Sequence, residues 1–278
     1  MKNRRLFGFI ITAMLLLTAC SYGLDNSSGT ASEHFTPVQT ESAVQSSRAS
    51  NEPIPQDNTQ SSQQDNPQSS QQDTKDEEEA PLPADKSDWK LILVNRKNPL
   101  PDGFTVELEE TIGTYKFDVR AADDLRAFMK AAKADGVALS VISTFRKQST
   151  QERLYAEKVA EYVNAGYNKD DAKNEAARWV AVPGTSEHQS GLAVDVVSAD
   201  WYSKNDDLYD TFENTDEFAW LIEHCVEYGF ILRFAKDKQE ITGITYEPWH
   251  YRYVGVENAR YMTEHNLCLE EYIALLNG

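Results

Sequence analysis

The hydrophobic pattern divides the chain of 278 residues into three parts. Residues 6–17 are an almost unbroken apolar run, and between residues 24 and 88 large apolar side chains nearly disappear. From Trp89 onward they return at regular spacings. This pattern predicts one folded domain over residues 89–278, because roughly 190 residues can bury a single substantial core.

Apolar residues recur at helical spacing in three segments of this domain. The first contains Leu125 and Phe128, and Gly136 is placed to end the helix. The second is interrupted at a polar stretch, where either Asn168 or Asp170 could cap a new helix. The predicted helical segments are residues 119–136, 149–180 and 215–229.

Short runs rich in Val, Ile, Leu, Phe and Tyr predict strands between these helices. Helices and strands do not alternate strictly along the chain, which disfavours a doubly wound parallel sheet. We therefore expect an α+β domain with a small, mainly antiparallel sheet and flanking helices. The predicted strands are residues 91–94, 137–143, 191–197, 230–234 and 251–254.

The N-terminal segment, residues 1–20, has the features of a secretion signal. It starts with basic residues, and its apolar run is shorter than the roughly 20 residues that span a membrane. Its ending, LTAC, resembles a bacterial lipobox, so Cys20 is predicted to become the lipidated first residue of the mature protein. The alternative is a plain signal peptide with an incidental cysteine. A lipidated Cys20 would anchor the protein to the outer face of the cell membrane.

Residues 21–88 form an acidic stretch rich in Ser, Gln and Pro. From Leu24 to Asp88 it contains 13 acidic and 3 basic residues, and SSQQD occurs twice. Such a segment cannot bury enough apolar surface to offset its ordering entropy, so we expect a disordered tether that lets the domain reach into the cell wall. The whole chain has a net charge of −18, and the predicted domain lacks clustered basic residues, which disfavours a nucleic-acid partner.

Two cysteines lie in the predicted domain, Cys225 and Cys268. They do not form a CxxC pair, so a thiolate zinc site is excluded. In an extracytoplasmic protein they could form one disulfide or remain buried thiols, and the sequence leaves both possibilities open.

The stretch SEHQSGLAVD, residues 186–195, combines a histidine with a carboxylate. If its second half is a strand, Asp195 shares one face with the small residues Gly191 and Ala193, which leaves space above that face. A carboxylate within an apolar strand needs a partner or a metal. His188 lies in the preceding loop and can fold back over Asp195.

The stretch EPWH, residues 247–250, adds a second histidine and another carboxylate. Proline at the second position favours a β-turn, which brings the first and fourth Cα atoms within about 7 Å. His188, Asp195 and His250 could then supply three ligands, with Glu247 as a nearby base. A single histidine is more often an ordinary surface or core residue, but this combination is typical of a catalytic zinc site with an open position.

Both stretches resemble signatures of the VanY-type zinc D,D-carboxypeptidases. SEHQSGLAVD matches S-x-H-x-x-G-x-A-x-D, and EPWH matches E-x-W-H. Residues 93–101 and 143–151 resemble the family's opening segment and its S-G-Y-R-S-x-x-x-Q block. These enzymes belong to the LAS superfamily, together with lysostaphin-like endopeptidases and hedgehog domains, so the resemblance implies that metallopeptidase fold over nearly all of residues 89–278.

The resemblance also implies a role for each matching residue. His188, Asp195 and His250 correspond to the ligands of Zn²⁺, and Glu247 corresponds to the catalytic base. The residues that match substrate-binding positions are Arg146, Gln151 and Ser186.

The implied activity is removal of the C-terminal D-alanine from peptidoglycan stem peptides, by a chain expected to act as a monomer. Thr144 and Phe145 stand where the family usually has glycine and tyrosine, which leaves the pocket less certain than the metal site. Three alternatives stay open. They are an L,D-carboxypeptidase acting on tetrapeptide stems, a D,D-dipeptidase, which suits a secreted chain poorly, and a non-catalytic wall-binding lipoprotein.

Overall fold

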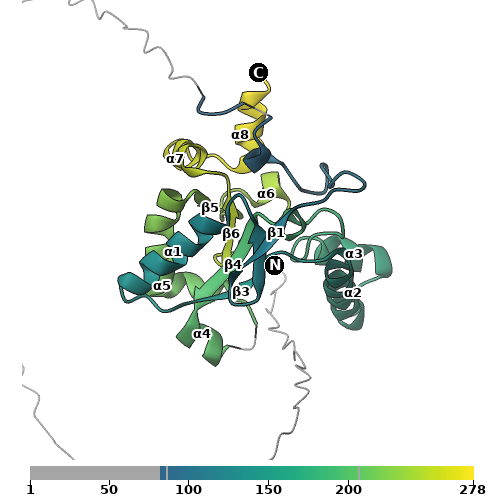
Figure 1. The fold of residues 1–278 in the computed structure, drawn as a ribbon. Coiled ribbons are helices and arrows are strands. Elements are labelled where there is room, and N and C mark those ends of the chain that lie inside the picture. The colour runs from purple at the N-terminus through teal and green to yellow at the C-terminus, as the bar shows by residue number, and fades with distance from the viewer. Residues whose placement is uncertain (1–81, 86, 206) are drawn as a thin grey trace, which may run out of the picture. The chain divides into compact units, whose positions relative to one another are not determined.

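The computed structural model describes residues 82–85, 87–205 and 207–278 (Figure 1). The predicted signal segment, Cys20 and nearly all of the predicted tether lie outside these residues. Within the described part of the chain, every helix is too short or too polar to cross a membrane.

A four-stranded sheet forms the centre of the domain, with the order β3-β4-β6-β5 and antiparallel pairing throughout. Each of its strands overlaps a predicted one, so the α+β prediction with an antiparallel sheet is confirmed. A separate hairpin, β1 (Leu108–Ile112) with β2 (Tyr115–Asp118), was not predicted, because its residues are mostly polar or half-exposed. The strands of the sheet are β3 (Leu139–Ser143), β4 (Ala193–Ser198), β5 (Phe230–Leu232) and β6 (His250–Tyr253).

The main core lies between the sheet and two helices, α1 (Ala122–Ala134) and α5 (Asp216–His224). Leu125 and Phe128 are fully buried, as the helical spacing predicts, and the ring of Phe128 stacks on that of Phe230 at 5.4 Å. A second cluster joins α7 (Val256–Glu264) and α8 (Leu269–Leu276) to the N-terminal segment. The short helices are α4 (Ala199–Lys204) and α6 (Gln239–Thr242).

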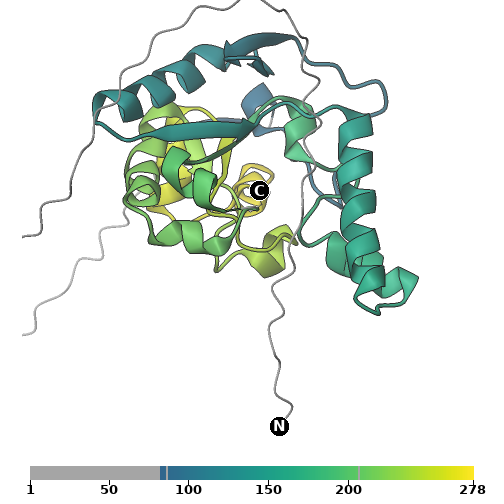
Figure 2. The same cartoon turned by 90° about the horizontal axis from the view of Figure 1, so that it is seen from below.

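The predicted helical segment 149–180 is a helical hairpin, α2 (Gln148–Asn164) and α3 (Lys169–Ala176). It lies at the side of the domain away from α1 and α5 (Figure 2). Asn168 caps α3, since its side chain accepts hydrogen bonds from the two backbone amides that follow the first helical residue. Tyr167 and Trp179 are each 45% exposed, so neither side chain belongs to the core.

The strand predicted at residues 91–94 is wrong. The chain forms a 3-10 turn, Trp89–Leu91, and then runs alongside β6 without joining the sheet. Nη2 of Arg252 donates to the carbonyl oxygens of Lys90 at 2.9 Å and Ile92 at 2.8 Å. A buried guanidinium thus takes the place that a neighbouring strand would have as hydrogen-bond partner.

The strand predicted from residue 191 begins instead at Ala193, because Gly191 adopts a left-handed conformation with φ of 78° and ends a 3-10 helix, Glu187–Ser190.

Cys225 and Cys268 are both buried and free, so the structure favours buried thiols over a disulfide.

Candidate metal centre and active site

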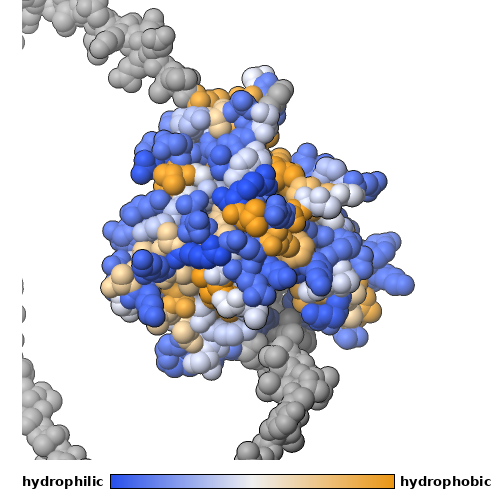
Figure 3. Space-filling model, in the orientation of Figure 1, coloured by the Kyte–Doolittle hydropathy of each residue, from blue (hydrophilic) through white to orange (hydrophobic). Residues whose placement is uncertain are grey.

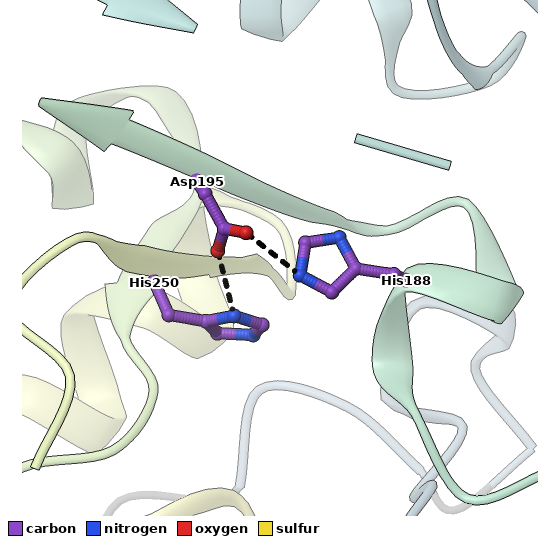
Figure 4. Close-up of side chains that lie close together, drawn as sticks. All are labelled: His188, Asp195 and His250. Carbon is purple, nitrogen blue, oxygen red and sulfur yellow. Dashed lines mark hydrogen bonds and ion pairs between the residues drawn. The ribbon is translucent and has the colours of Figure 1, made fainter. Parts of the chain in front are cut away.

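Three buried side chains from separate elements meet at one end of the sheet (Figure 4). His188 comes from the 3-10 helix, Asp195 from β4 and His250 from the start of β6. The β4–β6 register places Asp195 directly opposite His250. Oδ2 of Asp195 lies 3.1 Å from Nε2 of His188, and Oδ1 lies 3.0 Å from Nδ1 of His250. The three candidate ligand atoms lie within 4.8 Å of one another.

The hydrogen bonding of His188 fits a metal ligand. Its Nδ1 lies 2.7 Å from the carbonyl oxygen of Thr144, which can only accept, so Nδ1 carries the proton. In the neutral ring Nε2 then presents a lone pair to the carboxylate of Asp195. Burial and the charge of Arg146 lower the pKa of His188, which favours this neutral form. Two electron-rich atoms facing each other at this distance are stabilised by a cation, and imidazole nitrogen with carboxylate oxygen is a donor set that zinc accepts.

Glu247 lies beside this cluster on the predicted turn. The amide of His250 donates to the carbonyl oxygen of Glu247 at 3.2 Å, which closes a four-residue turn and confirms that prediction. Glu247 is 8% exposed, and its carboxylate lies 3.7 Å from Nδ1 of His250. Burial raises its pKa to about 8, although the nearby His250 acts in the opposite direction. A carboxylate whose pKa lies near neutrality suits a general base.

Arg146 lies at the edge of the cluster. Its Nη1 donates to Gln151 at 2.9 Å and its Nη2 to Ser143 at 3.0 Å, while Nη2 also lies 3.5 Å from Asp195. Gln151 is completely buried and donates in turn to the carbonyl oxygen of Ala181. Its side chain is therefore fixed in place and restrains the guanidinium of Arg146. The predicted substrate-binding residues Arg146 and Gln151 are thus brought together at the ligand cluster.

A groove of about 620 Å³ opens beside Arg146. One wall is the chain from Leu100 to Val106, and the other contains Phe145, Gln148 and Gln189. Figure 3 shows a hydrophobic patch near β1, which follows this wall, on a mostly hydrophilic face. Ser186 is 4% exposed and precedes the 3-10 helix that bears His188. The groove has both apolar and polar side chains in its lining, with Arg146 among them, which fits a peptide chain ending in a carboxylate.

Glu187 was not predicted as a site residue, although it lies inside the stretch SEHQSGLAVD. Its side chain is buried, and Oε1 accepts from Nε of Arg233 at 2.7 Å and from Nη1 of Arg252 at 2.8 Å. Burial alone would raise the pKa of Glu187, but the two guanidinium groups hold it well below its usual range. The sequence does hold a signal for such a residue. Arg233 and Arg252 each lie within an apolar segment predicted as a strand, and a buried charge requires a partner of opposite charge.

Comparison with known proteins identifies the family. The family model described as "VanY: D-alanyl-D-alanine carboxypeptidase" matches residues 114–256, just over half of the chain. The chain belongs to the VanY family. A D-alanyl-D-alanine carboxypeptidase of Enterococcus faecalis (strain ATCC 700802 / V583) is 47% identical to this VanY-family chain over 189 residues, which are 68% of this chain and 67% of the relative.

Solved VanY structures share the fold. VanYB in complex with D-alanine-D-alanine is 46% identical, has a TM-score of 0.60, and the match covers 67% of this chain and 98% of that one. A mutant of the vancomycin-resistance D,D-pentapeptidase VanY in complex with Zn(II) is equally similar, with 46% identity and a TM-score of 0.60 over 66% of this chain and 99% of that one. The LD-carboxypeptidase LdcB is 35% identical, with a TM-score of 0.54 over 66% and 84% of the two chains.

Proposed function

We propose that this protein is a zinc-dependent D,D-carboxypeptidase that removes the C-terminal D-alanine from peptidoglycan stem peptides. The observation that carries the proposal is the buried cluster of His188, Asp195 and His250 with Glu247 beside it in a VanY-family chain. The likeness to VanYB in complex with D-alanine-D-alanine supports the substrate.

His188 through Nε2, Asp195 through its carboxylate and His250 through Nδ1 would hold the zinc ion. When bound, zinc supplies a Lewis acid that polarises the scissile carbonyl and lowers the pKa of water to about 7. The hydrogen bond from Nδ1 of His188 to Thr144 fixes which nitrogen of that ring faces the cluster.

Glu247 and Arg146 would carry the remaining chemistry. Glu247 would accept a proton from the attacking water and donate it to the amine of the leaving D-alanine, as a general base and then a general acid. Arg146 would donate hydrogen bonds to the substrate's carbonyl or terminal carboxylate oxygens, with Gln151 holding its guanidinium in place. Ser186 would contact the substrate at the edge of the same loop, and the groove beside Arg146 would hold the stem peptide.

The proposal is tested with purified protein loaded with zinc. We expect release of free D-alanine from a pentapeptide that ends in D-Ala-D-Ala, and little release from the corresponding tetrapeptide. Glu247→Gln should lower this release by about 10²- to 10⁴-fold, while one zinc ion per chain stays bound, because only the proton acceptor is lost.

The matched control is Glu240→Gln, which changes an exposed glutamate on α6 and should leave release unchanged. Absence of release from the pentapeptide by the zinc-loaded wild type would overturn the assignment. Release from the tetrapeptide instead would identify an L,D-carboxypeptidase.

We further propose that the chain is an extracytoplasmic lipoprotein that acts as a monomer. The N-terminal signal pattern and the LTAC ending support lipidation at Cys20, and the acidic stretch 21–88 would connect that anchor to the catalytic domain. Cells expressing the full chain should retain it in the membrane fraction and label it with palmitate, whereas Cys20→Ala should abolish the label. Light scattering of the catalytic domain should give the mass of one chain.

A further inference from the structure

Glu187 divides its two carboxylate oxygens between two different kinds of partner. Oε1 accepts from the buried arginines Arg233 and Arg252, and Oε2 lies 3.5 Å from Nε2 of His250. Nε2 is the ring nitrogen on the side away from Asp195, which instead faces Nδ1. Glu187 therefore connects the candidate metal ligand to a buried network of charges.

We propose that Glu187 is a positioning residue for His250: its carboxylate accepts the Nε2 proton, so that Nδ1 presents its lone pair to the metal. The inference rests on the proposed zinc site. A histidine ligand commonly donates its second ring N–H to a carboxylate or a backbone carbonyl, which fixes the tautomer and the ring orientation. His188 has the carbonyl of Thr144 for this purpose, and Glu187 supplies the equivalent partner for His250.

The two arginines hold the Glu187 carboxylate in the position that this role requires. Both guanidinium groups are fully buried and donate to the same oxygen, so the carboxylate cannot rotate away without leaving charges unpaired. Arg233 is fixed in turn by two hydrogen bonds to Glu270, at 2.9 and 2.7 Å.

A ring contact restrains His250 as well. The ring of Phe234 packs on that of His250, with the centroids 4.7 Å apart. With the ring packed against Phe234 and Nδ1 facing Asp195, Glu187 places a carboxylate within reach of the remaining nitrogen, Nε2.

The competing interpretation is that Glu187 only neutralises the two arginines. Glu270 allows the two roles to be separated, because it belongs to the same network but accepts its hydrogen bonds from Arg233 and Asn95. Glu270→Gln should therefore disturb the network and leave the metal ligand in place. Glu187→Gln should disturb both the charge network and the metal ligand His250.

The experiment measures zinc affinity of the full chain by competition with a chromogenic chelator, without substrate. We expect Glu187→Gln to bind zinc about 10- to 100-fold more weakly than the wild type, and Glu270→Gln to bind it as tightly as the wild type. The ¹⁵N-coupled ring N–H resonance of His250 in the zinc-loaded protein gives a second readout. It should move in Glu187→Gln, because its carboxylate acceptor is lost, and stay in place in Glu270→Gln.

Wild-type zinc affinity in Glu187→Gln with an unmoved His250 resonance would overturn the inference. Equal weakening in Glu270→Gln would also overturn it, because the effect would then belong to the network as a whole. If Glu187→Gln does not fold, the same measurements are made on Glu187→Asp, which keeps the charge beside the arginines and withdraws the carboxylate from His250; unchanged affinity there is contrary to the inference. Failure of the wild type to release D-alanine would refute the proposed activity and leave this zinc measurement valid.

Discussion

At the residue scale, Arg146 lines the groove and also contacts the candidate ligand cluster. Its guanidinium donates hydrogen bonds to Gln151 and Ser143 and lies close to Asp195. Its side chain remains 17% exposed and lines the groove. A planar guanidinium can make several such contacts at fixed angles, which the single ammonium of lysine cannot.

We predict that Arg146→Lys lowers kcat/KM for the pentapeptide by about 10²-fold, because it removes aligned donors to a developing oxyanion while keeping the charge. Steady-state D-alanine release is the measurement. Arg153→Lys on α2 is the control, since Arg153 is 59% exposed and pairs with Glu157 on the same helix. An Arg146→Lys enzyme as active as this control would show that charge alone is sufficient.

At the element scale, the end of β6 packs closely against the 3-10 turn that follows α5, and Gly229 makes this close contact possible. Its φ is 79°, and a Cβ atom there would lie 2.9 Å from the Cα of Gly255 and 2.9 Å from a ring carbon of Tyr253. The backbone amides of Val254 and Gly255 both donate to its carbonyl oxygen. The sequence placed a helix end at this glycine, and the structure adds that a second segment packs directly against it.

Gly229→Ala should lower the free energy of unfolding by roughly 2 to 4 kcal/mol, from left-handed strain and steric overlap together. Gly243→Ala is the matched control, because Gly243 has a similar φ of 74° but a Cβ atom there would meet no atom of the described residues within 4 Å. Gly243→Ala should lower the free energy of unfolding by only about 1 kcal/mol, because it adds backbone strain without steric overlap. Urea denaturation measures both, and equal losses would show that the close packing at Gly229 contributes nothing.

At the scale of the whole molecule, a buried charge network joins segments that are far apart in the sequence. Glu270 at the start of α8 binds Arg233 and accepts a hydrogen bond from Asn95 near the N-terminal end of the domain. Arg233 and Arg252 meet at Glu187, next to the metal cluster. Both ends of the domain are thereby connected to the candidate active site.

Burial alone would raise the pKa of Glu270, but Arg233 outweighs it and holds the pKa below the ordinary value of 4.5. A group whose pKa is lower in the folded state stabilises the fold above its unfolded pKa, and this contribution is lost as the pH falls through the folded pKa. Glu270→Gln should therefore cost about 2 kcal/mol near neutral pH and progressively less below pH 4.5.

Urea denaturation across this pH range measures the effect, with the exposed Glu264→Gln on α7 as control. A difference between wild type and Glu270→Gln that stays constant with pH would contradict the assigned ion pair.

The sequence by itself determined the features that depend on local spacing. Apolar periodicity predicted the helix around Leu125 and Phe128, and Pro248 predicted the turn at EPWH. Both predictions are confirmed, because each relies on residues a few positions apart. Two short motifs also supplied His188, Asp195 and His250 as candidate metal ligands.

Tertiary structure alone decided which distant groups are partners. Asp195 and His250 are 55 positions apart and meet only through the β4–β6 register. The two arginines in apolar strands pointed to buried charge, but their position in the sequence did not identify Glu187 as the partner. The sequence also did not show that Arg252 would donate hydrogen bonds to the carbonyl oxygens of Lys90 and Ile92, at the segment that was predicted as a strand. Periodicity reports that a residue is buried, whereas the choice of its hydrogen-bond partner depends on how the whole chain packs.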